Sequence, residues 1–216
     1  AAGPGVLFVH WLGAPKTTNL TEFLPDAIEL AKHGARSILI DAMWSKPSWF
    51  EKGRTTATDY DASIEQVVDL RRSLDVLASL PGVDTKRIAY VGHDFGAMYG
   101  AVLSGVDSRP SVYVLMAGTP VFSEWYLLGA KPADVPAYVA QMAPLDPPGY
   151  LQRSHASAYL FQFSQHDAYI SPQREDEFAA AAPAPKATFV YRSTHALAEP
   201  QIRADRLAWL KSRLGV

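Results

Sequence analysis

The stretch IAYVGHDFGAMYG, residues 88–100, decides the fold. A short apolar run leads into Gly-His-Asp-Phe-Gly, and small residues that can open a helix follow it. Gly92 and Gly96 carry no β-carbon, so the chain can reverse sharply there and push the central residue, Asp94, out above the strand end. The pattern predicts a strand, a tight turn and a helix. It places a carboxylate at the carboxyl end of a strand, where parallel sheets bind ligands.

The rest of the chain alternates between apolar runs and helical patterns. Apolar runs occur at 5–10, 37–42, 87–92, 111–118, 158–164 and 187–192, and the main helical patterns at 60–80, 95–105, 172–182 and 199–214. In 60–80 one apolar stripe contains Ile64, Val67, Val68, Leu74 and Leu77. Continuous apolar strands suit a parallel sheet that helices cover on both faces. We therefore predict one doubly wound α/β domain over 1–216, with a mostly parallel sheet of about six strands.

Residues 119–150 interrupt this alternation. They are rich in proline and aromatic residues and have no strong period. A long segment of this kind in a compact domain is usually a lid or a binding loop. We expect a small lid here, with a plain surface loop as the alternative.

Composition excludes several classes of protein. The 216 residues are 48% hydrophobic and carry a net charge of −2 with scattered Lys and Arg, so no nucleic-acid partner is expected. No apolar run is long enough to cross a membrane, and no signal peptide is visible, which predicts a cytoplasmic protein. Whether the N-terminus has been trimmed stays open. The absence of cysteine rules out disulfides, a thiol nucleophile and thiolate metal sites. We predict no metal and no cofactor, and composition leaves the oligomeric state open.

The elbow and its surroundings resemble the α/β-hydrolase superfamily. The likeness covers nearly the whole chain, from FVHWLG (8–13) through VDTKRIAYVGHDFGAMYG (83–100) to the loop of His195. With its small lid and the late run LFQFSQHDAYISP (160–172), the plan is most similar to the dienelactone-hydrolase-like branch. That branch usually has serine or cysteine at the elbow. Aspartate at this position resembles haloalkane dehalogenases, haloacid dehalogenases of this fold and epoxide hydrolases.

An aspartate at the elbow implies its own chemistry. With a reference pKa of about 3.9, the carboxyl group is expected to be an anion at neutral pH without help from a base. It can displace a leaving group at a saturated carbon and form an alkyl ester, which water then cleaves. Two other interpretations stay open: Asp94 caps the following helix, or it belongs to a degenerate elbow in a protein without activity.

The resemblance also implies a base and an acid. His195 follows the last apolar run and precedes the closing helix, where the superfamily places the base that activates water. Asp167, directly after 158–164, is the expected acid that orients it, unless it only forms an Asx turn. Glu124 is the alternative acid. His93 is expected to point away from the cleft and pack.

Backbone N–H groups are expected to form the oxyanion hole. The donors implied by the resemblance are the N–H of Phe95, after the nucleophile, and that of Trp11 in the loop after the first strand. As a group, aromatic residues after strand ends and in the lid are expected to line an apolar pocket, and the residues near it are His10, Trp44, Trp49, Trp125 and Tyr126.

The function expected from these features is that of a cofactor-free hydrolase with the triad Asp94, His195 and Asp167. Its substrate would be a small apolar carbon–halogen compound or an epoxide. Phe95 stands where dehalogenases of this fold often have a halide-binding tryptophan, and Tyr126 and Tyr138 are the candidate tyrosines for opening an epoxide. Two alternatives remain: a dienelactone-like ester or lactone hydrolase, and an inactive protein that binds a small molecule.

Overall fold

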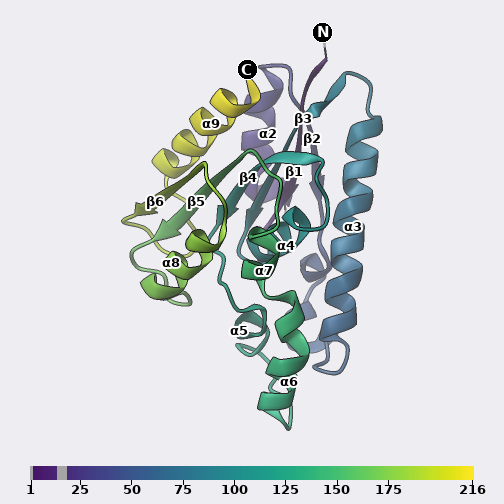
Figure 1. The fold of residues 1–216 in the computed structure, drawn as a ribbon, viewed down its shortest axis with the longest axis vertical. Coiled ribbons are helices and arrows are strands. Elements are labelled where there is room, and N and C mark those ends of the chain that lie inside the picture. Colours follow the sequence, from purple (N-terminus) through teal and green to yellow (C-terminus); the bar gives the residue numbers. More distant parts are fainter. Residues whose placement is uncertain (1, 14–18) are drawn as a thin grey trace.

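Six parallel strands form one sheet in the order β2-β1-β3-β4-β5-β6 (Figure 1). The computed structural model describes residues 2–13 and 19–216. The strands are β1 (Gly3–Val9), β2 (Arg36–Ile40), β3 (Val83–His93), β4 (Pro110–Met116), β5 (Ala158–Ser164) and β6 (Lys186–Tyr191). Every neighbouring pair is parallel, so the predicted fold class is confirmed.

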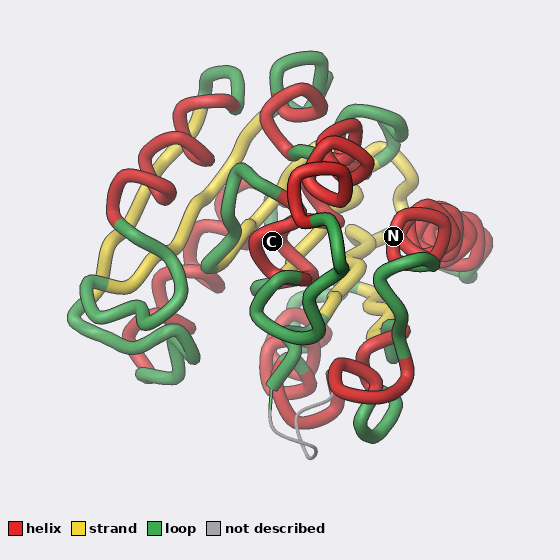
Figure 2. Tube along the Cα trace, turned by 90° about the horizontal axis from the view of Figure 1, so that it is seen from below, coloured by secondary structure: helices red, strands yellow, loops and turns green. Residues whose placement is uncertain are grey.

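Helices cover both faces of this sheet, as Figures 1 and 2 show. Helices α2 (Leu24–Ala31) and α9 (Pro200–Leu214) contact each other on one face. Helices α3 (Asp59–Ser79), α4 (Phe95–Ser104) and α8 (Pro172–Ala181) lie on the other. Four of them, α3, α4, α8 and α9, agree with the predicted helical patterns to within a few residues.

The buried face of α3 differs from the predicted stripe. Val67, Leu74 and Leu77 are buried, but Ile64 and Val68 are exposed. Polar residues take the inward positions beside them: the Ser63 hydroxyl lies 2.9 Å from that of Tyr126, and Gln66 Oε1 accepts a hydrogen bond from the Met43 N–H. A hydrophobicity pattern cannot reveal an inward face that is partly polar.

Residues 119–151 contain four short helices, of which α5 and α6 lie below the carboxyl ends of the strands in Figure 1, whereas α7 packs against α4. They are α5 (Phe122–Tyr126), α6 (Val135–Met142), η3 (Ala143–Leu145) and α7 (Pro147–Leu151). Helices this short make too few turns to give a clear period, which explains why the sequence pattern missed them. Three more short elements, α1 (Asn19–Glu22), η1 (Met43–Ser45) and η2 (Trp49–Gly53), follow β1 and β2. No helix in the described part of the chain is long and apolar enough to cross a membrane.

Candidate active site

Asp94 lies at the turn between β3 and α4 with φ 57° and ψ −116°. A non-glycine residue with this backbone conformation is strained, and such strain is concentrated at functional sites. The flanking glycines make the turn possible. A β-carbon on Gly92 would lie 2.3 Å from the Gly96 carbonyl oxygen, and one on Gly96 would lie 2.2 Å from the Val9 carbonyl oxygen.

The two carboxylate oxygens of Asp94 have different surroundings. Oδ2 accepts a hydrogen bond of 2.8 Å from the Leu12 N–H, and the nearby Phe95 N–H also acts to lower the pKa of this carboxyl group. Oδ1 has no hydrogen-bond partner within residues 2–13 and 19–216, although the side chain is buried. One oxygen is therefore held by a backbone donor, and the other is left without a donor among the described residues.

The second backbone donor is one residue away from its predicted position. The Trp11 N–H donates to Glu22 Oε2 at 2.9 Å and is not directed at Asp94. The N–H of Leu12 faces the carboxylate instead. The sequence could locate the loop, but the direction of each peptide in it depends on Glu22, which comes from a separate element.

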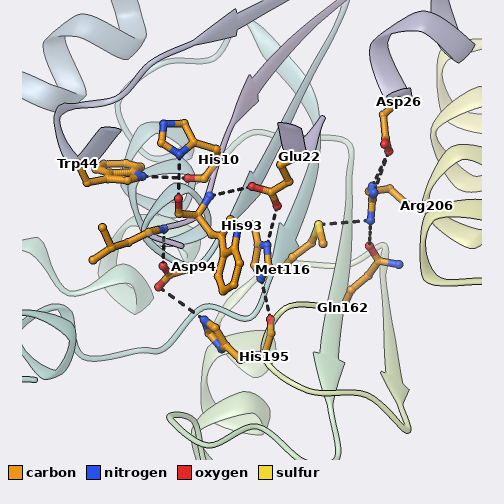
Figure 3. Close-up of polar contacts among 12 residues, drawn as sticks. His10, Glu22, Asp26, Trp44, His93, Asp94, Met116, Gln162, His195 and Arg206 are labelled. Atoms are coloured by element: carbon orange, nitrogen blue, oxygen red, sulfur yellow. Dashed lines mark hydrogen bonds and ion pairs between the residues drawn. The ribbon is translucent and has the colours of Figure 1, made fainter. Parts of the chain in front are cut away.

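His195 lies between the carboxyl groups of Asp94 and Asp167, and Figure 3 shows its contact with Asp94. Its Nδ1 is 2.7 Å from Asp167 Oδ2, and its Nε2 is 3.9 Å from Asp94 Oδ1. Because an ionised carboxylate only accepts hydrogen bonds, Nδ1 carries the proton of neutral His195 and donates it to Asp167. Nε2 is then left unprotonated on the side of Asp94, where it can take a proton.

Asp167 also forms an Asx turn, which was the alternative interpretation of this residue. Its Oδ1 accepts hydrogen bonds from the N–H groups of Tyr169 and Ile170, at 2.8 and 3.0 Å. Burial raises the pKa of Asp167, but the hydrogen bond from His195 and these two donors outweigh it, so the pKa lies below the usual range. The turn fixes one oxygen and leaves the other for His195, so the two interpretations are compatible.

Burial raises the pKa of Asp94 from its ordinary 3.8 to about 7, although the His195 ring and the Leu12 N–H act in the opposite direction. The expectation from the reference value, a carboxyl group fully ionised at neutral pH, is therefore wrong. A buried charge loses its hydration, and two amide donors replace only part of that hydration.

Glu124, the alternative acid, has other partners. Its Oε1 lies 2.6 Å from Arg174 Nη2, and its Oε2 accepts from the Thr119 hydroxyl at 2.8 Å. The carboxylate that contacts His195 is that of Asp167. The sequence could not separate the two, because both follow a strand at the same edge of the sheet.

A cavity of about 490 Å³ opens beside Asp94 and His195. Its walls are largely aromatic, and its rim contains polar residues of the segment 45–52. The aromatic residues that line it are Trp11, Trp44, Trp49, Phe50, Phe95, Trp125 and Tyr169. Three predicted pocket residues, Trp44, Trp49 and Trp125, belong to this set.

The other two predicted pocket residues, His10 and Tyr126, are not among the described residues that line the cavity. His10 is fully buried, and its Nδ1–H donates to the Trp11 carbonyl while Nε2 accepts from the Ala42 N–H. Burial lowers the pKa of His10, in agreement with a neutral ring. The Tyr126 hydroxyl contacts those of Tyr99 and Ser63.

Sequence reasoning missed three contributors to the site. Leu12 supplies the donor to Asp94, Glu22 holds the neighbouring peptide, and Tyr169 packs edge-on against the His195 ring with centroids 5.0 Å apart. Only Leu12 had a signal, its place in the loop that was predicted to supply a donor. Within the described ranges, no group of three His, Asp or Glu side chains is arranged to hold a metal ion.

No protein-family model and no curated protein matches this chain. Among solved structures, it is similar to 2,6-dihydroxy-pseudo-oxynicotine hydrolase, with 16% identity and a TM-score of 0.74 over 99% of this chain and 61% of that chain. It is also similar to the α/β hydrolase GrgF of Penicillium sp. sh18, with 14% identity and a TM-score of 0.73 over 100% of this chain and 91% of that chain. A third similar structure is that of a protein from Klebsiella pneumoniae subsp. pneumoniae assigned as a dienelactone hydrolase. Its identity is 17% and its TM-score 0.70, over 100% of this chain and 88% of that chain. At such identities the likeness concerns the fold, which is that of α/β hydrolases.

Proposed function

We propose that this protein is a hydrolase in which Asp94 attacks a carbon–halogen bond at a saturated carbon and forms a covalent alkyl ester. The observation that carries the proposal is the difference between the two oxygens of Asp94. Oδ1 has no donor among the described residues, so its lone pairs are available for attack. Oδ2 already lies against the Leu12 N–H, where negative charge develops later.

The reaction has two steps. In the first, Asp94 Oδ1 forms a bond to the substrate carbon, and the halide leaves with the electron pair of the broken bond. In the second, His195 Nε2 takes a proton from water as the water oxygen attacks Cγ of the ester. The resulting oxyanion is on Oδ2, beside the amides of Leu12 and Phe95. This tetrahedral intermediate then breaks its bond to the alkyl oxygen and releases the alcohol. The net products are the alcohol, the halide and one proton.

A carbon–halogen substrate is favoured over an epoxide by the tyrosines. An epoxide needs a proton donor for its departing oxygen, whereas a halide leaves as a weakly basic anion. The Tyr138 hydroxyl donates to Asp59 Oδ2 at 2.7 Å, and that of Tyr126 belongs to the Tyr99–Ser63 cluster. The Trp125 indole N–H, in contrast, has no acceptor among the described residues, and its ring lines the cavity.

The test is the intact mass of the His195→Gln protein after incubation with haloalkanes, haloalkanoates, epoxides and activated esters. Without its base, this variant is expected to form the ester and retain it, so its mass rises by the alkyl group of the true substrate. The modified peptide should contain Gly92 to Gly96, and Asp94→Asn should gain no mass. A His195→Gln protein that turns over as fast as the wild type would remove His195 from the mechanism.

Ester or lactone hydrolysis is the second candidate, because one similar solved structure is assigned as a dienelactone hydrolase. A single turnover in ¹⁸O-water with enzyme in excess separates the two. The covalent route gives unlabelled alcohol at first and puts the label into Asp94, because the product oxygen comes from the carboxylate. Label in the product from the first turnover, with faster cleavage of esters than of halides, would support the second candidate.

A further inference from the structure

Glu22 and the buried His93 form a polar pair beside the site (Figure 3). His93 ends β3 and is almost fully buried, and its Nδ1 lies 2.6 Å from Glu22 Oε1. The other nitrogen, Nε2, lies 2.9 Å from the backbone carbonyl oxygen of His195. The expectation that His93 packs away from the cleft misses this pair, which contacts the loop of the base directly.

Hydrogen-bond chemistry requires a proton between the two side chains. The His195 carbonyl oxygen can only accept, so Nε2 of His93 carries a hydrogen. A neutral His93 with its hydrogen on Nε2 would present a bare Nδ1 to an ionised carboxylate, and two lone pairs would meet at 2.6 Å. Either His93 is an imidazolium ion or Glu22 is protonated. In both cases the pair holds one proton more than neutral histidine beside an ionised carboxylate.

The pair also connects the two loops on which the second reaction step depends. Glu22 Oε2 accepts from the Trp11 N–H, and the next N–H in the chain, that of Leu12, holds Asp94 Oδ2. The Trp11 ring stacks on the His93 ring, with centroids 5.2 Å apart and planes 9° apart. Glu22 thus holds the loop whose Leu12 N–H is the oxyanion donor, and His93 holds the backbone of His195, the base.

We propose that Glu22 and His93 are positioning residues: a proton-sharing pair that sets the Leu12 N–H and the His195 ring at their working distances from Asp94. The kinetic part of this inference rests on the proposed function. Attack by Asp94 Oδ1 needs no base, whereas cleavage of the ester needs His195 and the oxyanion donor together. Loss of the pair is therefore expected to slow cleavage of the ester more than its formation.

The proton is tested by NMR of the full chain labelled with ¹⁵N-histidine. The signals of His93 are assigned as those lost in His93→Gln. In the wild type, we expect His93 to carry protons on both Nδ1 and Nε2, or to share a far-downfield proton between Nδ1 and the Glu22 carboxylate. In Glu22→Gln the side-chain amide donates to Nδ1 and its oxygen accepts from the Trp11 N–H, so the Nδ1 proton signal should disappear. A wild-type His93 without that proton signal, or an unchanged signal in Glu22→Gln, would overturn the shared proton.

The positioning role is tested by single-turnover kinetics with mass detection of the ester. Glu22→Ala is expected to slow ester cleavage about tenfold or more and to leave ester formation within about threefold. Glu22→Gln keeps both hydrogen bonds and should recover most of the loss, and the surface variant Glu29→Gln should behave as wild type. An equal loss in both steps, or no recovery in Glu22→Gln, would overturn the positioning role.

The two arms separate this inference from the proposed function. If no substrate gives a covalent ester in His195→Gln, the proposed function fails, and the NMR experiment still decides whether the pair shares a proton. If Glu22→Ala does not fold, Glu22→Gln and His93→Gln are compared by the same ratio of ester cleavage to ester formation. In that comparison, His93→Gln should show the larger loss in the rate of ester cleavage, because His93 itself contacts the His195 carbonyl oxygen.

Discussion

At Asp94, the two oxygens of one side chain have different surroundings, and the proposed reaction uses them for different tasks. A serine hydroxyl has a single oxygen, which cannot accept from the Leu12 N–H and attack a carbon from a second position. The carboxylate has both, because Oδ2 is held at 2.8 Å from that N–H and Oδ1 is left without a donor among the described residues. The arrangement requires a buried carboxyl group, and burial raises its pKa to about 7. The burial that leaves Oδ1 without a donor therefore also destabilises the charge of the carboxylate.

Because burial destabilises the charge of Asp94, we predict that Asp94→Asn stabilises the protein above neutral pH. The pKa of Asp94 is about 7 in the folded protein and near 3.8 when unfolded. Between these values the folded state keeps a proton that the unfolded state has lost, so wild-type stability falls as pH rises from about 4 to 7. Asparagine has no charge and avoids this loss. At about 1.4 kcal/mol per pKa unit, the gain at pH 8 is at most about 4 kcal/mol.

The measurement is urea unfolding of Asp94→Asn and wild type at pH 4 and pH 8. The difference in the free energy of unfolding should be small at pH 4 and full at pH 8. Asp69→Asn, which changes an exposed carboxylate on α3, is the matched control and should change little at either pH. An equal gain at both pH values would contradict a raised pKa at Asp94.

At the scale of elements, one buried cluster attaches the segment 119–150 to the main sheet layer. Tyr138 on α6 donates to Asp59 Oδ2 at 2.7 Å, and Asp59 starts α3. Arg54 pairs with both oxygens of Asp59, at 2.9 and 2.6 Å, and its guanidinium lies over the Tyr126 ring of α5. The cluster thus joins α3, α5 and α6 beside the aromatic cavity.

Tyr138→Phe is expected to loosen α6 while leaving the global fold in place. Removing the hydroxyl leaves Asp59 paired with Arg54, so the loss in the free energy of unfolding should be about 1 kcal/mol. Local opening should rise, and amide hydrogen exchange in 135–142 should become faster. Tyr150→Phe is the control, because its hydroxyl donates to the Pro144 carbonyl within the same segment. Faster exchange of α6 in the control as well would rule out the Tyr138–Asp59 bond as the attachment.

At the scale of the whole molecule, an ion pair in the core joins three parts of the fold. Asp26 on α2 is fully buried, and Arg206 on α9 lies 2.8 Å from its Oδ1. Arg206 also donates to Gln162 of β5 at 3.2 Å, as Figure 3 shows. A second arginine of α9, Arg203, pairs with Asp26 Oδ2 at 3.1 Å, but its side chain is 42% exposed, against 5% for Arg206.

The two arginines allow a matched comparison. Arg206→Met leaves Asp26 buried with only the partly hydrated Arg203, and we expect it to lower the free energy of unfolding by about 3 kcal/mol. Arg203→Met keeps the buried partner and should cost under about 1 kcal/mol. Both are measured by urea unfolding at pH 7. The reaction rate should change little, because α2 and α9 lie on the face of the sheet opposite α3 and α4. Equal losses in the two variants would contradict a dominant role for burial.

The strands and long helices were predictable because each carries its own local signal. β5 matches its predicted range residue for residue, and the elbow was identified from two glycines around Asp94. The contact of His195 with Asp167 agrees with the order along the chain, although the choice between Asp167 and Glu124 stayed open in the sequence. The short helices of 119–150 and the π-turn at Trp49–Gly53 were not predictable, because elements of so few residues are stabilised by packing and have little periodicity of their own.

The sequence by itself determined the parallel sheet, the strained turn at Asp94 and the strand ends at which the site lies. These follow from short-range rules: apolar runs, helical periods and glycines where a β-carbon cannot fit. Only the tertiary structure decided that Leu12 is the donor in place of Trp11, that Glu22 pairs with His93, and that burial raises the pKa of Asp94. Hydrogen-bond partners and hydration depend on residues that are distant in the chain, such as Glu22 and His93, 71 positions apart. Local patterns hold no information about those distances.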